Sequence, residues 1–228
     1  MMDAAATSRL RRQVLLRFAS AFIFMMAMLF LPAGTLTYWQ AWIYLVVMFL
    51  PATFAFVWLL KDKPELAERR IQWRERDVTQ GRIVSLAGVA MLATFVVPGF
   101  DFRWGWSDVP LVVVIVGDAI VLASYLLVIW VLQVNEFASR VVRVEQSQRV
   151  VDTGPYAIIR HPMYLGVMGM ILATPLALGS LWALIPAVVI IPVLMARIRE
   201  EEAVLVRDLP GYADYVRRVR HRLIPGIW

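Results

Sequence analysis

Two short polar blocks in the second half of the sequence hold the residues that could do chemistry. One contains Arg160-His161-Pro162-Met163-Tyr164, and the other reads RIREEE from Arg197 to Glu202. Arginine and imidazole side chains are cationic hydrogen-bond donors, whereas glutamates supply carboxylates. Tyr156 and Tyr164 add flat aromatic surfaces. This set would suit a zwitterionic, aromatic, water-soluble ligand with an extra positive centre, which the spacing alone does not name.

Composition excludes several other kinds of site. The chain has no cysteine, so disulfides, thiolate metal sites and a cysteine nucleophile are excluded. Its two histidines, His161 and His221, make a multi-histidine metal centre unexpected, and we predict no metal. No strand, glycine loop and helix unit is present, which excludes a soluble Rossmann-type methyltransferase.

The elements that must position these blocks are membrane helices. Of the 228 residues, 61% are hydrophobic and 18% charged, against about 45–50% and about 25% in soluble domains. Apolar stretches of the length that a bilayer requires cover residues 14–34, 39–60, 82–100, 109–133, 163–179 and 181–198. We therefore predict an all-α polytopic membrane helix bundle with about six transmembrane helices. Residues 1–133 would form helices one to four. Residues 134–228 would form a cofactor-binding loop, a helical hairpin and a C-terminal cytosolic segment of the same integrated domain.

Basic residues predict the orientation. The outer turns would be 35–38, 101–108 and Gly179–Ser180, and Arg103 is their one Lys or Arg. The inner segments 1–13, 61–81, 134–162 and 199–228 hold most of the others. The positive-inside rule then places both termini and both polar blocks at the cytoplasmic face. The net charge of +6 thus indicates topology and contact with anionic lipid, and we expect no nucleic-acid partner.

The last two apolar stretches are expected to form a hairpin that brings His161 beside Glu201. Pro162 fits the first turn of a helix, where its missing N–H costs nothing. Gly166 and Gly169 are more typical of helix packing than of ligand binding. Asp118 would either line a substrate tunnel or hydrogen-bond a neighbouring helix. Segment 61–81 is predicted to hold a charged loop with a short amphipathic helix, and 199–228 a charged, aromatic tail.

The motif GPYAIIRHPMYLG, followed by RIREEE and a tail rich in tyrosine and arginine, resembles the isoprenylcysteine carboxyl methyltransferase family. That group includes membrane methyltransferases of phospholipids and small thiols, and the resemblance covers roughly residues 134–228. It implies an S-adenosylmethionine pocket that is closed by the C-terminal segment, opens to the cytosol and receives a lipophilic or prenylated substrate from the bilayer. The cofactor contacts that it implies are Gln148, Arg149, Val150, Val151, Tyr156, His161, Pro162, Met163, Tyr164, Glu201 and Glu202.

The resemblance also implies roles for the second block. Glu201 would hold the ammonium or ribose of the cofactor and take part in catalysis, with Glu202 as its substitute if the alignment shifts by one residue. Arg197 would face the reacting end of the substrate and act as a catalytic residue, and Arg199 would be a further substrate contact. Gln148 stands where a histidine is common in the family. Attack on a sulfonium methyl is a single in-line displacement, for which the protein mainly supplies alignment.

Two other functions stay open. Sterol reductases share an HPxY-type element and a similar ending, so a membrane reductase that uses NADPH is the alternative enzyme. A carrier, channel or scaffold is the third class, although the charges gather at one face instead of along a path through the membrane. The methyl acceptor is equally open among a prenylated peptide carboxylate, a phospholipid amine, a quinone-like hydroxyl and a small thiol.

Overall fold

A computed structural model describes residues 4–62, 81–135, 137 and 148–228. Within these ranges it has seven α-helices, one 3₁₀ helix and no strand. The long helices match the six apolar stretches: α1 (Ala4–Ala33), α2 (Trp39–Asp62), α4 (Gly81–Trp104), α5 (Leu111–Val134), α6 (Pro162–Ala177) and α7 (Leu184–Asp208). The 3₁₀ helix η2 (Gly154–Ala157) and the short α8 (Tyr212–Arg218) flank the last pair. The all-α prediction is confirmed for the described part of the chain.

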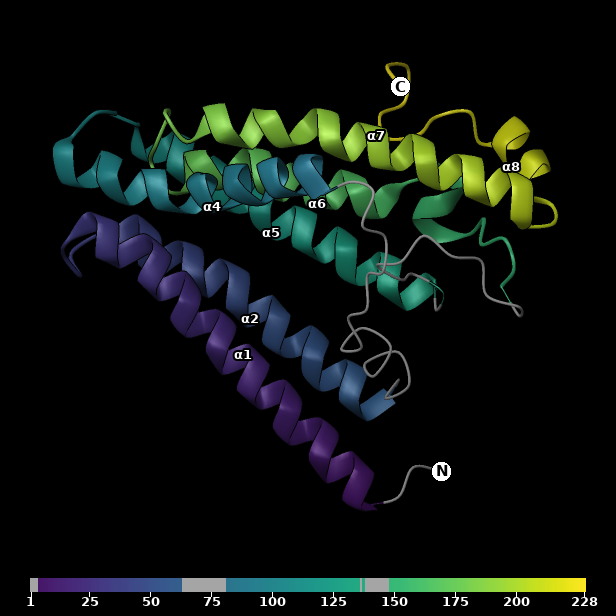
Figure 1. The fold of residues 1–228 in the computed structure, drawn as a ribbon, viewed down its shortest axis with the longest axis horizontal. Coiled ribbons are helices and arrows are strands. Elements are labelled where there is room, and N and C mark those ends of the chain that lie inside the picture. Colours follow the sequence, from purple (N-terminus) through teal and green to yellow (C-terminus); the bar gives the residue numbers. More distant parts are fainter. Residues whose placement is uncertain (1–3, 63–80, 136, 138–147) are drawn as a thin grey trace.

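The helices run back and forth along one elongated bundle (Figure 1). Helix α5 packs along α6, α1 along α4, and α7 against α4 and α6, while α2 contacts α5. In the view of Figure 1, α1 and α2 meet the other helices at the end that holds the short turns and lean away from them toward the N-terminus. The bundle therefore has one closed end, where the short turns lie.

Within the part of the chain that the structure describes, three helical segments are long and apolar enough to cross a membrane. They are Leu15–Ala33, Trp39–Trp58 and Leu111–Val134, and α6 is a shorter apolar helix. Large apolar side chains on these helices face outward, with Leu31, Phe54 and Val112 each more than two-thirds exposed. So much exposed apolar surface suits a lipid environment. These features indicate an integral membrane protein, and the count of six crossings stays a prediction.

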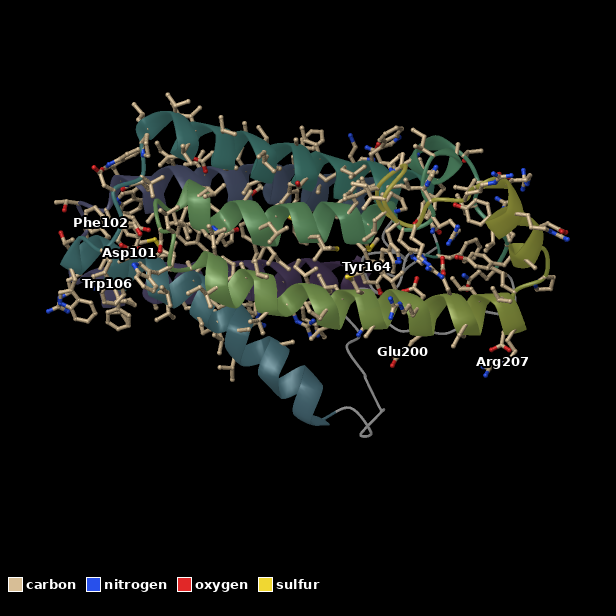
Figure 2. All side chains as sticks on the ribbon, turned by 90° about the horizontal axis from the view of Figure 1, so that it is seen from above. Asp101, Phe102, Trp106, Tyr164, Glu200 and Arg207 are labelled. Carbon is tan, nitrogen blue, oxygen red and sulfur yellow. The ribbon has the colours of Figure 1, made fainter. Side chains whose placement is uncertain are left out.

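The short turns are tied together by the carboxylate of Asp101, which is 1% exposed. It accepts hydrogen bonds from Ser107 N and Ser107 Oγ (both 2.7 Å) and from Ser180 Oγ (2.5 Å). The hydroxyl of Tyr38 donates to the carbonyl of Leu178 at 2.5 Å. The turns after α1, α4 and α6 thus lie at one end of the bundle, where Figure 2 labels Asp101. This agrees with the predicted placing of the three outer turns on one side.

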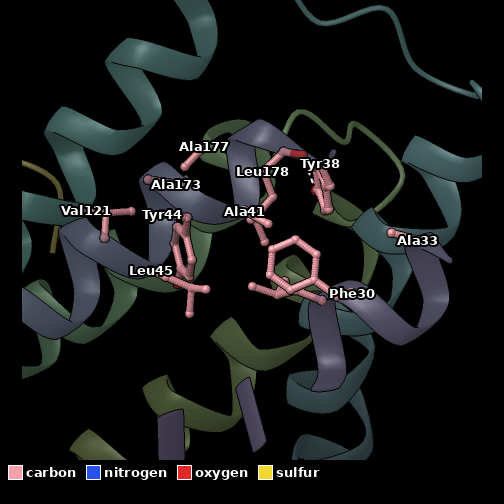
Figure 3. Close-up of a cluster of buried hydrophobic side chains, with 11 residues drawn as sticks. Phe30, Ala33, Tyr38, Ala41, Tyr44, Leu45, Val121, Ala173, Ala177 and Leu178 are labelled. Atoms are coloured by element: carbon pink, nitrogen blue, oxygen red, sulfur yellow. Dashed lines mark hydrogen bonds between the residues drawn. The ribbon is translucent and has the colours of Figure 1, made fainter. Parts of the chain in front are cut away.

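The main hydrophobic core lies next to these turns, where α1, α2, α5 and α6 meet (Figure 3). Tyr44 is fully enclosed there, and its hydroxyl pairs with Thr174 Oγ1 at 2.8 Å. The other buried residues of this core have aliphatic or aromatic side chains. They are Leu29, Phe30, Ala33, Tyr38, Ala41, Leu45, Val121, Ala173, Ala177 and Leu178. Burial of these side chains holds the helices together at the closed end.

Glycines let α5 and α6 approach each other closely. A Cβ atom on Gly117 would lie 2.5 Å from the backbone nitrogen of Ala177. One on Gly166 would lie 2.9 Å from the carbonyl oxygen of Ser124, and one on Gly169 would meet the hydroxyl of the same serine. The interpretation of Gly166 and Gly169 as helix-packing positions is confirmed.

Two boundaries differ from the prediction. The turn between α6 and α7 spans residues 178–183 and is longer than Gly179–Ser180. Helix α7 continues to Asp208, although residues from 199 onward were predicted as tail. The sequence REEEAVLVRD consists largely of good helix formers and ends shortly before Pro210, which disfavours continuation.

Two further predictions have partial outcomes. Residues 63–80 of the predicted charged loop and its amphipathic helix lie outside the described residues. Asp118 is 8% exposed, and its Oδ1 atom has no hydrogen-bond partner among the residues that the structure describes. No helix in the described ranges therefore donates a hydrogen bond to this oxygen.

Substitution of Gly117 by alanine tests the close packing of α5 and α6. Its Cβ would meet backbone atoms of α6 that cannot move independently, so Gly117→Ala should lower the free energy of unfolding by about 1–3 kcal/mol. Gly88→Ala is the matched control, since a Cβ there meets nothing within 4 Å, and a helical alanine should be neutral or stabilising by about 0.5–1 kcal/mol. Thermal unfolding in detergent would measure both, and equal midpoints for the two variants would contradict the packing.

Candidate active site

The candidate site lies at the end of the bundle opposite Asp101, where the segment before α6, the charged half of α7 and the C-terminal segment meet. Backbone hydrogen bonds join the first and last of these: Arg160 N donates to His221 O, and His161 N donates to Arg222 O, both at 2.9 Å. Helix α6 then begins at Pro162, which occupies its first turn as predicted. The polar residues before α6 are thus fixed against the C-terminal segment.

Glu202 is the centre of the buried charges. Its Oε1 accepts a hydrogen bond from Arg160 Nε at 2.6 Å and lies 3.2 Å from His161 Nε2. Its Oε2 accepts from Arg222 Nε at 2.6 Å. Glu202, Arg160 and His161 are all less than one-tenth exposed. One carboxylate therefore links α7, the segment before α6 and the C-terminal segment.

These partners keep Glu202 ionised. Burial alone would raise the pKa of the carboxyl group, but the hydrogen bonds from His161, Arg160 and Arg222 outweigh it and lower the pKa to about 2. Both oxygens of the carboxylate are occupied by these partners. Glu202 is therefore a charged structural link with little capacity left for a ligand.

Glu201 has a different environment, although it is the adjacent residue. The hydroxyl of Tyr164 donates to Glu201 Oε2 at 2.6 Å, and Arg197 Nε donates to the same hydroxyl at 3.2 Å. The rings of His161 and Tyr164 pack edge to face with centroids 5.8 Å apart. Figure 2 labels Tyr164 on the side facing α7, away from the Asp101 end. In the described part of the chain, Glu201 accepts this one hydrogen bond, so its carboxylate keeps capacity for another donor.

The stretch from 148 to 157 lies against α8. Val150 packs on a buried cluster that consists of Leu209, Tyr212, Tyr215 and Val219. Tyr215 donates its hydroxyl to the carbonyl of Tyr156 at 2.7 Å, and Asn135 Nδ2 donates to the hydroxyl of Tyr156 at 2.9 Å. Helix α8 thus positions the first polar block from one side.

The structure brings most of the predicted site residues to this end. Direct contacts join His161, Tyr164, Arg197, Glu201 and Glu202. Pro162 and Met163 form the first turn of α6 between them, and Gln148, Arg149, Val150, Val151 and Tyr156 belong to the stretch beside α8. Arg199 is exposed on α7, with its guanidinium carbon 5.9 Å from the centre of the Trp228 ring. The roles of these residues toward a ligand stay predictions.

One residue of the site was not predicted as a site member, Arg222, whereas Arg160 was expected among its cationic donors. The arginines of the tail were expected at anionic lipid, yet Arg222 donates to Glu202. A buried glutamate does signal that cationic partners are needed. Several arginines surround it in the sequence, however, and spacing does not say which of them reaches it.

Comparison with known proteins relates the segment that holds these residues to a family of methyltransferases. Residues 112–209 match the phospholipid methyltransferase family, which includes the isoprenylcysteine carboxyl methyltransferases. The predicted resemblance is therefore confirmed over this segment, which holds α5, α6 and α7 with both glutamates. Such a match supports methyltransferase activity on a lipid-like substrate.

One curated relative is the nickel-cobalt-cadmium resistance protein NccN of Alcaligenes xylosoxydans xylosoxydans, which is 35% identical over 78 residues. The alignment covers 32% of this chain and 35% of that protein. The matched region thus spans about a third of the length of the relative.

Substitution of Glu202 tests its structural role. Glu202→Gln keeps the shape but removes the charge that faces the buried Arg160, and loss of one partner of a buried ion pair costs about 3–5 kcal/mol. We expect the free energy of unfolding to fall by that amount, measured by denaturant titration in detergent. Glu200→Gln is the matched control on the same helix, because an exposed side chain should change stability by less than about 0.5 kcal/mol. Equal losses in the two variants would contradict the role of Glu202.

The same pair of proteins should respond to pH. Because the pKa of Glu202 is lowered from 4.5 to about 2, its stabilisation is fully present above pH 4.5 and is lost as the pH falls through about 2. The stability difference between wild type and Glu202→Gln should therefore be constant from pH 7 to pH 4.5 and shrink toward zero near pH 2. A difference that persists at the lowest pH would show that the charge is not its source.

Proposed function

We propose that the protein transfers a methyl group from S-adenosylmethionine to a lipid-like acceptor, because residues 112–209 match the phospholipid methyltransferase family. The site would be formed by the start of α6, the charged half of α7 and the C-terminal segment. The observation that carries the proposal is the contact of Tyr164 with Glu201 and Arg197, which joins both parts of the family motif.

The groups at this site fit S-adenosylmethionine. That molecule has an ammonium and a carboxylate on its amino-acid part, two ribose hydroxyls, an adenine ring and a sulfonium centre. Glu201 has capacity for the ammonium or a ribose hydroxyl, whereas both oxygens of Glu202 are already bonded. The contacts therefore favour Glu201 over Glu202 as the glutamate that binds the cofactor. The other lining residues would be Gln148, Arg149, Val150, Val151, Tyr156, His161, Pro162, Met163 and Tyr164.

The residues of the chain would mainly provide alignment. When bound, S-adenosylmethionine supplies a methyl group that its sulfonium already activates, and correct positioning can lower a barrier by about 7–11 kcal/mol. The hydroxyl of Tyr164 holds Arg197 and Glu201 on either side of it. Arg197 could bind an acceptor carboxylate through two parallel hydrogen bonds, with Arg199 as a further substrate contact. With an amine acceptor, Glu201 could instead take the proton.

We place this site at the cytoplasmic face of a protein with six crossings. The gathered turns at the Asp101 end support an even number of passes, because they alternate with connections at the other end. Arg103 is the single basic residue in the predicted outer turns, whereas the site end is rich in arginine. The cofactor would then enter from the cytosol and the lipid-like acceptor from the bilayer.

Ligand binding tests this function against its alternative. Isothermal titration of the purified protein in detergent should show binding of S-adenosylhomocysteine and none of NADPH. Binding of NADPH alone would favour a reductase of the sterol-reductase type. If the folded protein binds neither, the enzyme assignment is wrong. If S-adenosylhomocysteine binds, radiolabel transfer from S-adenosylmethionine into a total lipid and peptide extract would identify the acceptor.

The role of Glu201 gives a sharper prediction. A hydrogen bond to a charged group contributes about 1.5–3 kcal/mol, so Glu201→Gln should weaken S-adenosylhomocysteine binding about tenfold or more. Glu200→Gln serves as the control, with an affinity within about twofold of wild type. Unchanged affinity in Glu201→Gln would remove this residue from the cofactor site.

A further inference from the structure

The side chain of Asn135 joins the end of α5 to the 3₁₀ helix η2. Asn135 follows the last residue of α5, where its backbone N–H donates to the carbonyl of Val131 at 2.9 Å. Its Nδ2 atom donates to the hydroxyl of Tyr156 at 2.9 Å, across 21 positions of the sequence. A long apolar helix is thus linked directly to an aromatic ring of the candidate site.

The backbone decides which way the amide of Asn135 points. Its Oδ1 atom accepts a hydrogen bond from the N–H of Phe137 at 2.9 Å. The amide oxygen therefore faces Phe137, and the NH₂ group, which can only donate, faces Tyr156. A short side chain that bonds the backbone two residues further on is typical of asparagine in turns. Asn135 is thus held in one orientation by its own segment and presents a donor to the tyrosine.

Tyr156 is held both at its backbone and at its hydroxyl. Its N–H donates to the carbonyl of Thr153 at 3.2 Å, and its carbonyl accepts from the hydroxyl of Tyr215 at 2.7 Å. These bonds fix the backbone but leave the ring free to rotate about χ1 and χ2. Asn135 holds the opposite end of the side chain, so it restrains the orientation of the ring.

Close packing of η2 on α5 keeps the two partners together. Gly154 has a positive φ of 58°, and a Cβ atom there would lie 3.1 Å from Cγ2 of Val134. The adjacent Pro155 is buried. The start of η2 therefore rests on the last turn of α5, and the bond from Asn135 to Tyr156 joins two elements that pack on each other.

The orientation of this ring matters because Tyr156 is one of the predicted contacts of the cofactor. A side chain that is ordered before binding loses little conformational entropy when a ligand packs on it, so the ligand binds more tightly. A binding residue therefore benefits from neighbours that hold it in its productive rotamer. Asn135 is placed to do this for Tyr156 from the side opposite α8.

We propose that Asn135 is a positioning residue for the cofactor, which holds the ring of Tyr156 in the orientation on which the ligand packs. This inference rests on the proposed function, because it takes S-adenosylmethionine as the ligand and Tyr156 as one of its contacts. Asn135 itself touches neither the cofactor nor the acceptor. Its role extends the site to the end of α5, so that the helix packed along α6 also contributes to cofactor binding.

A double-mutant cycle tests the proposal. Asn135→Ala removes the donor, whereas Tyr156→Phe removes the hydroxyl and leaves the bond between Asn135 and Phe137 in place. Isothermal titration in detergent should show that each variant binds S-adenosylhomocysteine about fivefold more weakly than wild type, which corresponds to one neutral hydrogen bond. The double variant should lie within about twofold of Tyr156→Phe, because the effect of Asn135 passes through the hydroxyl that is already lost.

A purely structural role gives a different pattern. If Asn135 only ends α5, Asn135→Ala should weaken binding by the same factor in wild type and in Tyr156→Phe, and this result would overturn the proposal. Unchanged affinity in either single variant would overturn it as well. Should Asn135→Ala fail to fold, as judged by its thermal midpoint, Tyr156→Phe carries the test, because it leaves the end of α5 intact. If wild-type protein binds no S-adenosylhomocysteine, the proposed function fails too, whereas equal binding by wild type and both single variants defeats this inference alone.

Discussion

The ionised carboxylate of Glu202 is the interaction on which the site end of the protein depends. It is buried, and burying a charge is costly unless it is paired and fully hydrogen-bonded. Arg160, His161 and Arg222 meet that requirement from two segments that lie far from each other in the sequence. The loop before α6, the second half of α7 and the C-terminal segment therefore have one common anchor. The geometry around Tyr164 follows from it, because α6 begins directly after Arg160 and His161.

The three adjacent glutamates of α7 have different surroundings although they follow one another in the sequence. Successive residues of a helix point about 100° apart, so Glu200, Glu201 and Glu202 have three different surroundings. Glu200 is exposed, Glu201 contacts Tyr164, and Glu202 is saturated by cations. The sequence predicted that this acidic run would meet the loop at His161, and it does. It could not separate the three carboxylates, since their partners depend on how α6, α7 and the tail pack. Arg222 was missed for the same reason, because only the docking of the C-terminal segment brings it to Glu202.

Hydropathy predicted the positions of the six long helices well and their ends less well. The stretch 109–133 agrees closely with Leu111–Val134, because apolar residues fill that helix to both ends. The stretch 181–198 stops ten residues before α7 does, because hydropathy reports the apolar part of a helix and not the polar continuation. The segment 148–161 could not be placed by pattern, since its partners are the backbone of residues 221–222 and the side chains of α8.

The glycine contacts between α5 and α6 also restrict how a lipid could move through the protein. At Gly117 and Gly166 the two backbones are separated by less space than a single methyl group needs. Parting these helices would expose backbone surface along much of their length, so this seam is sealed against an acyl or prenyl chain. If the proposed acceptor enters laterally from the membrane, it would pass along a helix boundary other than that between α5 and α6.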